Sequence, residues 1–307
     1  MIIPAPADLA SRYRISNGSR FRLTDIDPND PWGKRLKPIA GEMLKQSRKR
    51  MASLQERLYA QDRWSILLIF QAMDAAGKDG TIKHVMSGVN PQGCDVHAFK
   101  APSSEELDHD FLWRTNRRLP RRGHIGIFNR SYYEETLVVR VHQNILAKQQ
   151  LPPDLVTKNI WRERFEDINA YERYLARQGV LVRKFFLHVS KDEQRKRFLE
   201  RLDKPEKSWK FSPADVGERS HFAAYMSAYE DMIRHTSTEW APWHVIPADR
   251  KWFTRLVVSA AIIDAIQSLD PRFPEVDPAV RAEFKKVKEQ LEAEDRGKTP
   301  ARKAKKK

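Results

Sequence analysis

The chain has 307 residues, of which 40% are apolar, so it can bury a large core in one or two domains. Its Lys and Arg residues exceed its Asp and Glu residues by 15 charges, and such a surface attracts polyanions: nucleic acid, anionic membrane or polyphosphate. The single cysteine, Cys94, excludes an internal disulfide and a metal site built from several cysteines.

The chain carries no secretory or membrane-spanning pattern. Its start, MIIPAPADLASRYRI, has no charged segment followed by an apolar run, and no stretch of about 18 apolar residues occurs anywhere. We therefore expect a cytoplasmic protein that does not enter a membrane.

Composition divides the chain into three regions. Residues 1–33 are rich in Pro, Asp, Asn and Gly and are predicted to form an extended arm. Residues 34–290 are predicted to form a single domain, with a lid at about 200–220. Residues 291–307 end in RGKTPARKAKKK and are predicted to be a basic, disordered tail.

The domain opens with a helix and a buried strand. A long amphipathic helix is predicted over residues 34–61, where apolar residues recur at roughly helical spacing: Ile39, Met43, Met51, Leu54 and Leu58. The segment WSILLIF, residues 64–70, is almost entirely apolar, which is typical of a strand buried on both faces of a parallel sheet.

Helices and strands alternate through the rest of the domain. Helices are predicted over 77–87, 103–120, 131–146, 154–179, 191–202, 221–237 and 250–269. Strands are predicted over 93–101, 123–129, 180–190 and 243–248. This alternation is typical of an α/β fold with a doubly wound parallel sheet flanked by helices.

The sequence AMDAAGKDGT, residues 72–81, has the arrangement of a phosphate-binding loop between a strand and a helix. In such loops backbone N–H groups hold phosphate oxygens and a lysine, here Lys78, neutralises them. The pattern G-x-x-x-x-G-K-[ST] fails at two positions, because Ala72 replaces the first glycine and Asp79 replaces the magnesium-binding hydroxyl. The alternative is a helix start that merely contains Gly-Lys-Asp-Gly.

With no hydroxyl at position 79, magnesium needs another ligand. We expect Asp74 to be that metal ligand, since a carboxylate suits a hard cation, while Asp79 is either a second ligand or an acid of the helix's first turn. The residues expected to contact phosphate here are Ala75, Ala76, Gly77, Lys78, Asp79, Gly80, Thr81 and Lys83.

A second motif, GHIGIFNRSYYEE, ends a strand at Asn129 and Arg130. P-loop kinases carry a carboxylate at this strand tip. The amide of Asn129 can instead bind a nucleotide hydroxyl or an acceptor phosphate, or simply cap the next helix. Arg130 can clamp phosphate with two hydrogen bonds, or form a salt bridge to Glu134 or Glu135, either of which could reach the rim of the site.

The third motif is the basic segment RKRFLERLDKPEKSWKFSPAD, residues 195–215. Its position after a late strand suggests a lid, which excludes water and brings positive charge to a transferring phosphoryl group. The alternative is a solvated helix face. The residues expected to contact phosphate from this lid are Arg197, Arg201, Lys204, Lys207 and Lys210.

These three motifs together resemble the family-2 polyphosphate kinases, over most of residues 35–270. The resemblance implies a thymidylate-kinase-like P-loop fold with a helical lid. It also implies transfer of a terminal phosphoryl group between inorganic polyphosphate and nucleotides, with Mg²⁺ or Mn²⁺ as cofactor. The expected partners are polyphosphate, AMP, ADP, ATP and also GMP and GDP, and we expect a homo-oligomer, a dimer or tetramer.

The resemblance also implies roles for single residues. Asp74 and Lys78 match the loop residues that act on phosphate and metal, Arg130 matches the arginine of the second motif, and Arg201 matches a lid arginine better than Arg197 does. These four, Asp74, Lys78, Arg130 and Arg201, are the predicted catalytic residues. Asn129 departs from members that carry Asp, and this form looks more like the branch that accepts AMP as well as ADP.

Three other functions fit parts of the sequence. The first is a polyphosphate kinase that accepts only ADP. The second is a nucleoside monophosphate kinase that uses ATP, against which the missing glycine and hydroxyl of the loop argue. The third is a basic nucleic-acid-binding protein, which ranks low because no recognition helix or aromatic RNA motif is visible; we expect no nucleic-acid partner.

Overall fold

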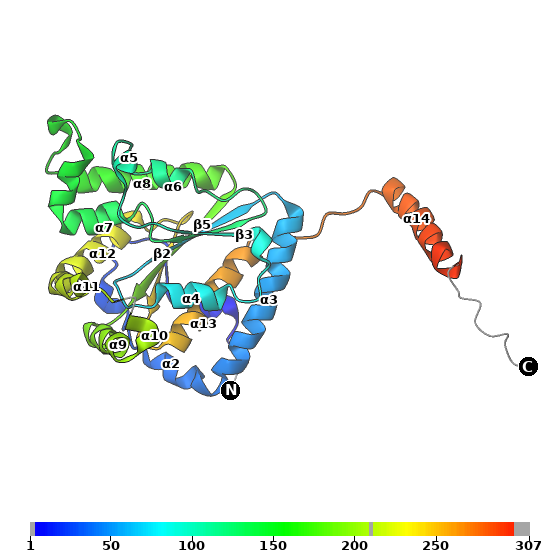
Figure 1. Ribbon diagram of the computed structural model, residues 1–307, viewed down its shortest axis with the longest axis horizontal. Helices are drawn as coiled ribbons and strands as arrows, with labels where there is room; N and C mark the ends of the chain where they lie inside the picture. Colours follow the sequence, from blue (N-terminus) through cyan, green and yellow to red (C-terminus); the bar gives the residue numbers. More distant parts are fainter. Residues whose placement is uncertain (1–3, 209–210, 298–307) are drawn as a thin grey trace, which may run out of the picture. The chain divides into compact units, whose positions relative to one another are not determined.

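The computed structural model describes residues 4–208 and 211–297. Within residues 4–272, a six-stranded sheet forms the middle layer (Figure 1). Its order is β1-β6-β5-β2-β4-β3. Strands β2 to β6 pair in parallel, and β1 pairs with β6 in the antiparallel direction. The strands are β1 (Arg14–Ile15), β2 (Ser65–Gln71), β3 (Cys94–Ala98), β4 (Ile125–Asn129), β5 (Val180–His188) and β6 (Trp243–Pro247).

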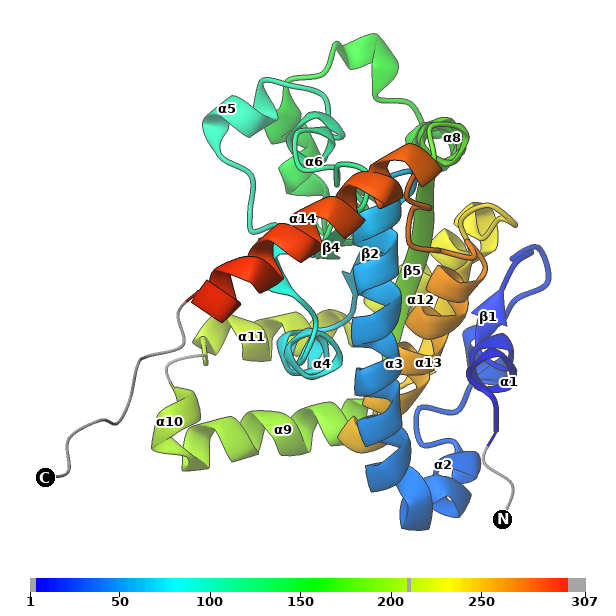
Figure 2. The same cartoon turned by 90° about the vertical axis from the view of Figure 1, so that its right-hand side faces the viewer.

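Two layers of helices cover the sheet, which confirms the predicted α/β fold. Helices α1, α3, α4 and α13 pack together in one layer, and α7, α8 and α12 pack together in the other (Figures 1 and 2). The bounds of these helices are α1 (Pro6–Ser11), α3 (Ala40–Gln61), α4 (Lys78–Val85), α7 (Glu134–Val141), α8 (Ile160–Arg177), α12 (Phe222–Thr236) and α13 (Lys251–Gln267).

The central strand β2 sets the position of the site. It pairs with β4 on one side and β5 on the other, so its apolar side chains from Ile66 to Phe70 are fully buried. The register places Phe70 opposite Asn129 of β4. Because parallel strands end at the same edge of a sheet, the loops after β2 and β4 meet there, where doubly wound sheets bind their ligands.

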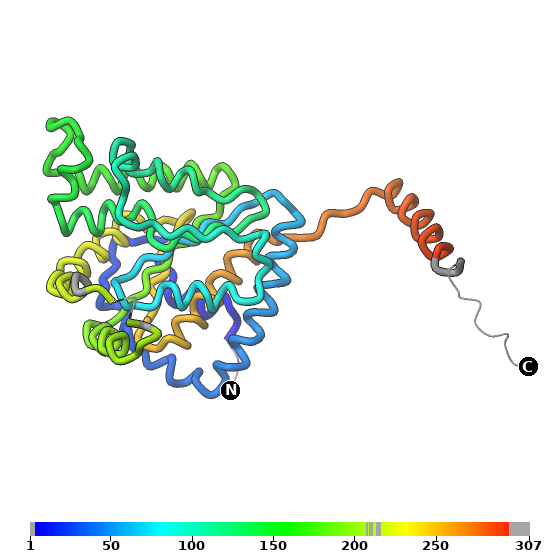
Figure 3. The backbone as a smooth tube through the Cα atoms, in the orientation of Figure 1, coloured from blue at the N-terminus to red at the C-terminus, as the bar shows by residue number. Residues whose placement is uncertain are grey.

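The structure corrects the prediction of an extended N-terminal arm. Residues 6–36 contain α1, β1 and α2 (Pro31–Leu36), and α1 packs against α13. Figure 3 traces this blue segment beside the orange helix. Tyr13 is buried, and its hydroxyl donates to Asp30 Oδ2 at 2.8 Å. The many Pro and Asp residues serve as helix starts and turns, while a few apolar side chains anchor the segment.

Several other boundaries also differ from the prediction. The first long helix begins at Ala40, because Pro38 lies in a preceding 3₁₀ turn. The helix predicted over 103–120 is instead two short ones, α5 (Ser104–Leu107) and α6 (Trp113–Asn116). Between them Asp110 Oδ1 accepts the Leu112 N–H at 2.9 Å, a local bond that competes with helix continuation.

The chain divides into two compact units, Met1–Arg272, called unit 1, and Phe273–Lys307, called unit 2. The predicted single domain, residues 34–290, therefore omits the N-terminal part of unit 1 and includes part of unit 2. Unit 2 contains α14 (Pro278–Gly297). Part of the predicted disordered tail, residues 291–297, is therefore helical, while residues 298–307 lie outside the described residues.

The segment predicted as a lid follows β5. It consists of the end of α9 (Lys191–Asp203), α10 (Pro205–Ser208) and α11 (Pro213–Glu218), as Figure 2 shows. Lys210 and the side chain of Lys207 lie outside the described residues. Within the described ranges no helix is both long and apolar enough to cross a membrane.

Candidate phosphate-binding site

The loop after β2 turns sharply before α4 begins. Ala75 and Gly77 have φ angles of 62° and 100°, in the left-handed region that Gly adopts at no cost. Gly77 is the N-cap of α4, and no side chain caps the helix. Its first N–H groups and the positive end of its dipole are therefore directed at the loop, an arrangement suited to a phosphate group.

Lys78, the first residue of α4, lies buried beneath this loop. Its Nζ donates to the Ala72 carbonyl oxygen at 2.6 Å. Burial, and secondarily the positive charge of Arg130, lower the pKa of Lys78 to about 8. The lysine is thus desolvated and held by only a carbonyl in the described structure, and an incoming phosphate oxygen would complete its charge pairing.

Arg130 lies directly after β4 and connects the second motif to the phosphate loop. Its backbone has a φ of 66°, and its N–H donates to the Phe70 carbonyl at 3.0 Å. Its Nη2 donates to Asp74 Oδ1 at 2.9 Å and its Nη1 to Glu134 Oε2 at 3.4 Å. The charges of Glu134 and Asp74 raise the pKa of Arg130, so it remains a cation.

The two glutamates of the second motif, Glu134 and Glu135, lie in different surroundings. Glu134 shares the site with Arg130 and also accepts from Gln71 Nε2 at 2.7 Å. Glu135 is buried away from the site and accepts from Arg164 Nε at 3.2 Å. Of the two salt bridges anticipated for Arg130, the structure therefore contains the one to Glu134.

Asn129 connects the tip of β4 to the first turn of α4. Its Nδ2 donates to Asp79 Oδ1 at 2.7 Å. Helix α7 begins at Glu134 and its N-cap is Tyr133, so Asn129 does not cap the following helix. This hydrogen bond therefore ties the end of β4 to the first turn of α4.

Arg197 of α9 is buried behind the loop and binds protein atoms. Its Nη1 donates to the Ala76 carbonyl at 2.7 Å, its Nη2 to the Ala248 carbonyl at 2.6 Å, and its Nε to Glu193 Oε1 at 2.8 Å. These bonds join the phosphate loop to the end of β6. The sequence predicted that Arg197 contacts phosphate. These bonds instead favour a structural role, in which Arg197 holds the loop in place.

Two adjoining cavities flank the Asp74–Arg130 pair, and both are also lined by Met73. The larger, of about 1030 Å³, contains the phosphate loop and extends along α9 to Arg201 and Lys251. The smaller, of about 410 Å³, extends toward α7, the turn that follows it, the end of α11 and α12. Its lining there includes Val138, His142, Asn144, Lys148, Glu218, Tyr225 and Tyr229.

Most of the predicted site residues meet in these cavities. The larger one is lined by Asp74, Ala75, Gly77, Lys78, Asp79, Gly80, Asn129, Arg130, Arg197 and Arg201, and Glu134 lines the smaller one.

Four predicted residues that the structure describes, Ala76, Thr81, Lys83 and Lys204, do not line either cavity. Thr81 is buried within α4 and Lys83 is exposed on it. Ala76 contributes its carbonyl to Arg197, and Lys204 Nζ lies 2.9 Å from Glu200 Oε1.

Sequence reasoning missed several residues around the site. Gln194 Nε2 donates to the Asp74 carbonyl at 3.0 Å, and Arg219 Nη1 donates to Gln194 Oε1 at 2.8 Å. The only sequence signal for Gln194 is its spacing of three from Arg197, which places both on one face of α9. Lys251 and Tyr225 belong to later helices, and nothing local links them to the loop.

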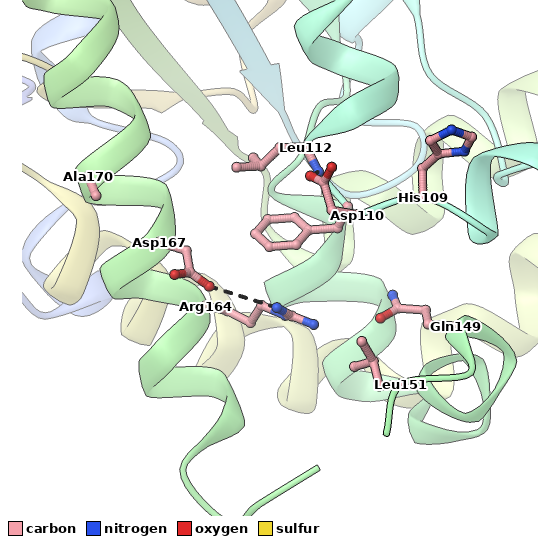
Figure 4. Close-up of a pocket in the computed structure, with 9 residues that line it drawn as sticks. His109, Asp110, Leu112, Gln149, Leu151, Arg164, Asp167 and Ala170 are labelled. Atoms are coloured by element: carbon pink, nitrogen blue, oxygen red, sulfur yellow. Dashed lines mark hydrogen bonds and ion pairs between the residues drawn. The ribbon is translucent and has the colours of Figure 1, made fainter. Parts of the chain in front are cut away.

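A third cavity, of about 330 Å³, lies between the segment before α6 and helix α8 (Figure 4). Arg164 and Asp167 form an ion pair of 3.8 Å in its wall. None of the predicted site residues lines it. It is therefore distinct from the cavities at the phosphate loop.

The comparisons with known proteins agree with this geometry. Residues 37–274 match the family described as polyphosphate kinase 2 (PPK2). The ADP-polyphosphate phosphotransferase of Rhodopseudomonas palustris is 50% identical over 285 residues, which cover 91% of this chain and 97% of that protein. The AMP/ADP-polyphosphate phosphotransferase of Meiothermus ruber is 44% identical over 269 residues, which cover 87% and 97%.

A solved structure extends the similarity to three dimensions. The crystal structure of polyphosphate kinase 2 from Arthrobacter aurescens TC1 superposes with a TM-score of 0.84 at 39% sequence identity, and covers 94% of this chain and 98% of that one. The match in sequence and in fold leads to one conclusion: the chain belongs to the polyphosphate kinase 2 family.

Proposed function

We propose that this protein transfers the terminal phosphoryl group of inorganic polyphosphate to AMP and to ADP. The observation that carries the proposal is the pair of cavities that meet at Asp74 and Arg130. Phosphoryl transfer requires donor and acceptor on opposite sides of the moving group, and positive charge beside it. Arg130 lines both cavities and Lys78 lines the larger one, so the place where the cavities adjoin satisfies both requirements.

The larger cavity suits the phosphate chain. It contains the start of α4, Lys78, Arg201 and Lys251, which are the groups that attract successive phosphates. The smaller cavity suits a nucleoside, because Tyr225 and Tyr229 offer aromatic rings and His142 and Asn144 offer hydrogen-bonding groups. In this assignment the acceptor phosphate meets the donor chain beside Arg130.

The donor set at the meeting point fits a magnesium or manganese ion bound together with substrate. Among the described residues no group of three or more His, Cys, Asp or Glu side chains could hold a metal alone. Mg²⁺ is usually bound by one or two carboxylates, water and substrate phosphates, which Asp74 allows because its side chain is 35% exposed. When bound, the ion supplies positive charge to the phosphates.

The chain's own residues have separate tasks in this proposal. The N–H groups at the start of α4 and the Lys78 ammonium bind the phosphates of the donor. Arg130 orients the phosphate that is transferred and offsets its developing charge. Arg201 and the helices α10 and α11 cover the cavity and exclude water, which would otherwise compete with the nucleotide as acceptor.

The acceptor is the least constrained part of the proposal. The Rhodopseudomonas relative is named for ADP and the Meiothermus relative for AMP and ADP. Asn129 favours the second possibility, because a neutral amide tolerates an acceptor phosphate in two registers better than a carboxylate does. We also propose GMP and GDP as acceptors, because none of the described residues is assigned to distinguishing guanine from adenine.

A set of parallel assays tests the proposal. Purified protein is incubated with polyphosphate and Mg²⁺ and with AMP, ADP, GMP or GDP in turn, in the absence of ATP, and the nucleotide products are separated. We expect ADP and ATP from AMP, and ATP from ADP, with neither formed by Lys78→Ala. Formation of ADP from AMP only when ATP is the donor would instead identify a nucleoside monophosphate kinase.

A further inference from the structure

Helix α14, in unit 2, is well defined by its own sequence. Its start is fixed by Asp277, whose Oδ1 accepts the Ala279 N–H at 2.8 Å and whose carbonyl accepts the Arg281 N–H at 2.8 Å. From there to Gly297 the helix contains many Lys and Glu residues and no internal Pro or Gly. Its sequence therefore favours a stable helix over a disordered tail.

One face of α14 is an apolar stripe. Its members Val280, Phe284, Val287 and Leu291 are 40%, 56%, 49% and 58% exposed. Their spacing of four, three and four residues keeps them within an arc of about 60° on the helix surface. Large apolar side chains arranged in this way are the seam of a coiled coil, with Phe284 and Leu291 at a positions and Val280 and Val287 at d positions.

The charged residues beside the stripe distinguish between the two orientations in which a pair of such helices could pack. Arg281 and Lys288 lie along one edge, at e positions, and Glu283 lies along the other, at a g position. In a parallel, in-register pair of such helices, each g residue faces the e residue five positions further on in the partner helix. Glu283 of each copy would then face Lys288 of the other.

The opposite orientation would bring like charges together. In an antiparallel pair the two e edges face each other, so Arg281 and Lys288 of one helix would face the same residues of the other. Like charges in this position are destabilising. The charge pattern of α14 therefore matches a second copy of itself, and matches it in one orientation.

We propose that α14 is a self-association helix, which pairs in parallel and in register with α14 of a second copy of this chain. The stripe spans only two heptads, so an isolated peptide would associate weakly, and the pairing is to be measured on the full chain. The proposal does not depend on the phosphate-binding site, because it is argued only from residues of α14.

Disulfide trapping tests the register directly. The chain's own thiol, Cys94, is half-buried, and burial raises its pKa to about 12, so it reacts slowly with oxidants and disulfides. The trapping variants are made in a Cys94→Ser background, which leaves the introduced cysteine as the one thiol of the chain. Val280→Cys and Leu291→Cys are each expected to form a disulfide with the same residue of a second copy on mild oxidation. Glu289→Cys, on the opposite face, is the matched control and should react at least about tenfold more slowly.

The two orientations give different products. In an antiparallel pair neither variant would form a disulfide with itself, and only a mixture of Val280→Cys and Leu291→Cys chains would. That result, or equal rates for the seam and control positions, would overturn the proposal. Equal rates would also be seen if the stripe were covered by the chain's own residues.

Charge reversal tests the partner by an independent route. By sedimentation of the full chain over a range of concentrations, Phe284→Glu/Leu291→Glu should reduce the average mass. Glu283→Lys and Lys288→Glu should each weaken association, while the double variant Glu283→Lys/Lys288→Glu should restore it. Thermal unfolding controls for folding of unit 1. Masses that are the same for wild type and all variants would refute self-association through α14.

Discussion

Arg130 Nη2 lies 2.9 Å from Asp74 Oδ1, a contact between residues 56 positions apart that joins the tip of β4 to the phosphate loop. Both side chains are more than one third exposed, so the pair adds little to stability. Its effect is on geometry, because it fixes the Asp74 carboxylate at the point where the two cavities meet before any substrate binds.

The first prediction concerns Asp74 as a metal ligand. Asp74→Asn keeps the side-chain shape but removes the charge, so we expect a higher Mg²⁺ concentration at half-maximal rate together with a lower maximal rate. Asp79→Asn is the matched control, since it removes a carboxylate from the same loop and helix start. A magnesium titration of both variants decides the matter, and an unchanged titration for Asp74→Asn would reject the assignment.

The second prediction concerns pH and Lys78, whose pKa is lowered to about 8. Below that pH the free protein carries a charged ammonium that attracts phosphate, and above it the charge is lost. The KM for polyphosphate should therefore rise as the pH increases from 7 to 9. Lys78→Arg stays charged throughout, so its KM should not show this rise, although its rate will be lower. Parallel pH profiles in both proteins would contradict the role of Lys78.

The third prediction separates two arginines of α9. Arg197→Lys cannot reproduce the bonds to the carbonyls of Ala76 and Ala248, and each buried carbonyl left without a donor costs about 1–3 kcal/mol. We expect a clear loss in the free energy of unfolding as well as activity.

Arg201→Lys is the comparison for that experiment, because Arg201 lines the cavity and is half-buried. It should lower the rate of phosphoryl transfer with little effect on the melting temperature. Chemical denaturation and steady-state rates of both variants are needed. If the two variants lose the same amount of stability, the positioning role of Arg197 is wrong.

The fourth prediction concerns the acceptor and the Asn129–Asp79 contact of 2.7 Å. Asn129→Asp places a second carboxylate against Asp79, which should change the ratio of AMP to ADP phosphorylation more than it lowers their sum. The exchange Asn129→Asp/Asp79→Asn keeps both the hydrogen bond and the net charge, and moves the charge to the strand tip. If its ratio equals that of the wild type, the hydrogen bond matters and the position of the charge does not.

The fifth prediction concerns a buried ion pair behind the second motif. Lys184 Nζ donates to Glu172 Oε2 at 2.6 Å and to the Tyr133 hydroxyl at 2.8 Å, and both charged side chains are fully buried. Glu172→Gln should reduce stability by about 3–5 kcal/mol, because it leaves the Lys184 charge unpaired. The double variant Glu172→Gln/Lys184→Met keeps an acceptor for the tyrosine hydroxyls and removes the unpaired charge, so it should be more stable than Glu172→Gln, as denaturant unfolding would show. If its loss of stability equals the sum of the losses in Glu172→Gln and Lys184→Met, the two residues are not coupled.

The convergence of Asp74, Lys78 and Arg130 was predictable from the sequence because local rules were sufficient. An apolar strand, a loop with Gly77 and a helix start predict a phosphate-binding loop, and parallel strands bring their ends together at one edge. Arg197 was not predictable in the same way. Its spacing from Arg201 suggests a shared exposed face, whereas its burial depends on carbonyls of Ala76 and Ala248, which only the tertiary fold brings near.

The second motif shows the same limit. Its sequence gives no role to Tyr132 and Tyr133, and in the structure both donate to Glu172 in the core, at 2.8 Å. Their partner on α8 carries no pattern that marks it. Likewise, the apolar residues of the N-terminal segment are too few to indicate periodicity, so its place beside α13 was missed.

The pairing of β1 with β6 has a consequence for the order in which the protein is made. The segment that contains α1 and β1 leaves the ribosome before its partners in β6 and α13, which emerge about 230 residues later, an interval of roughly 10 to 50 seconds at ordinary synthesis rates. During that time the apolar side chains of Leu9 and Tyr13 have no surface to cover. The segment that contains α1 and β1 thus reaches its native contacts late, and β1 is added to the edge of the sheet only after β6 has been made.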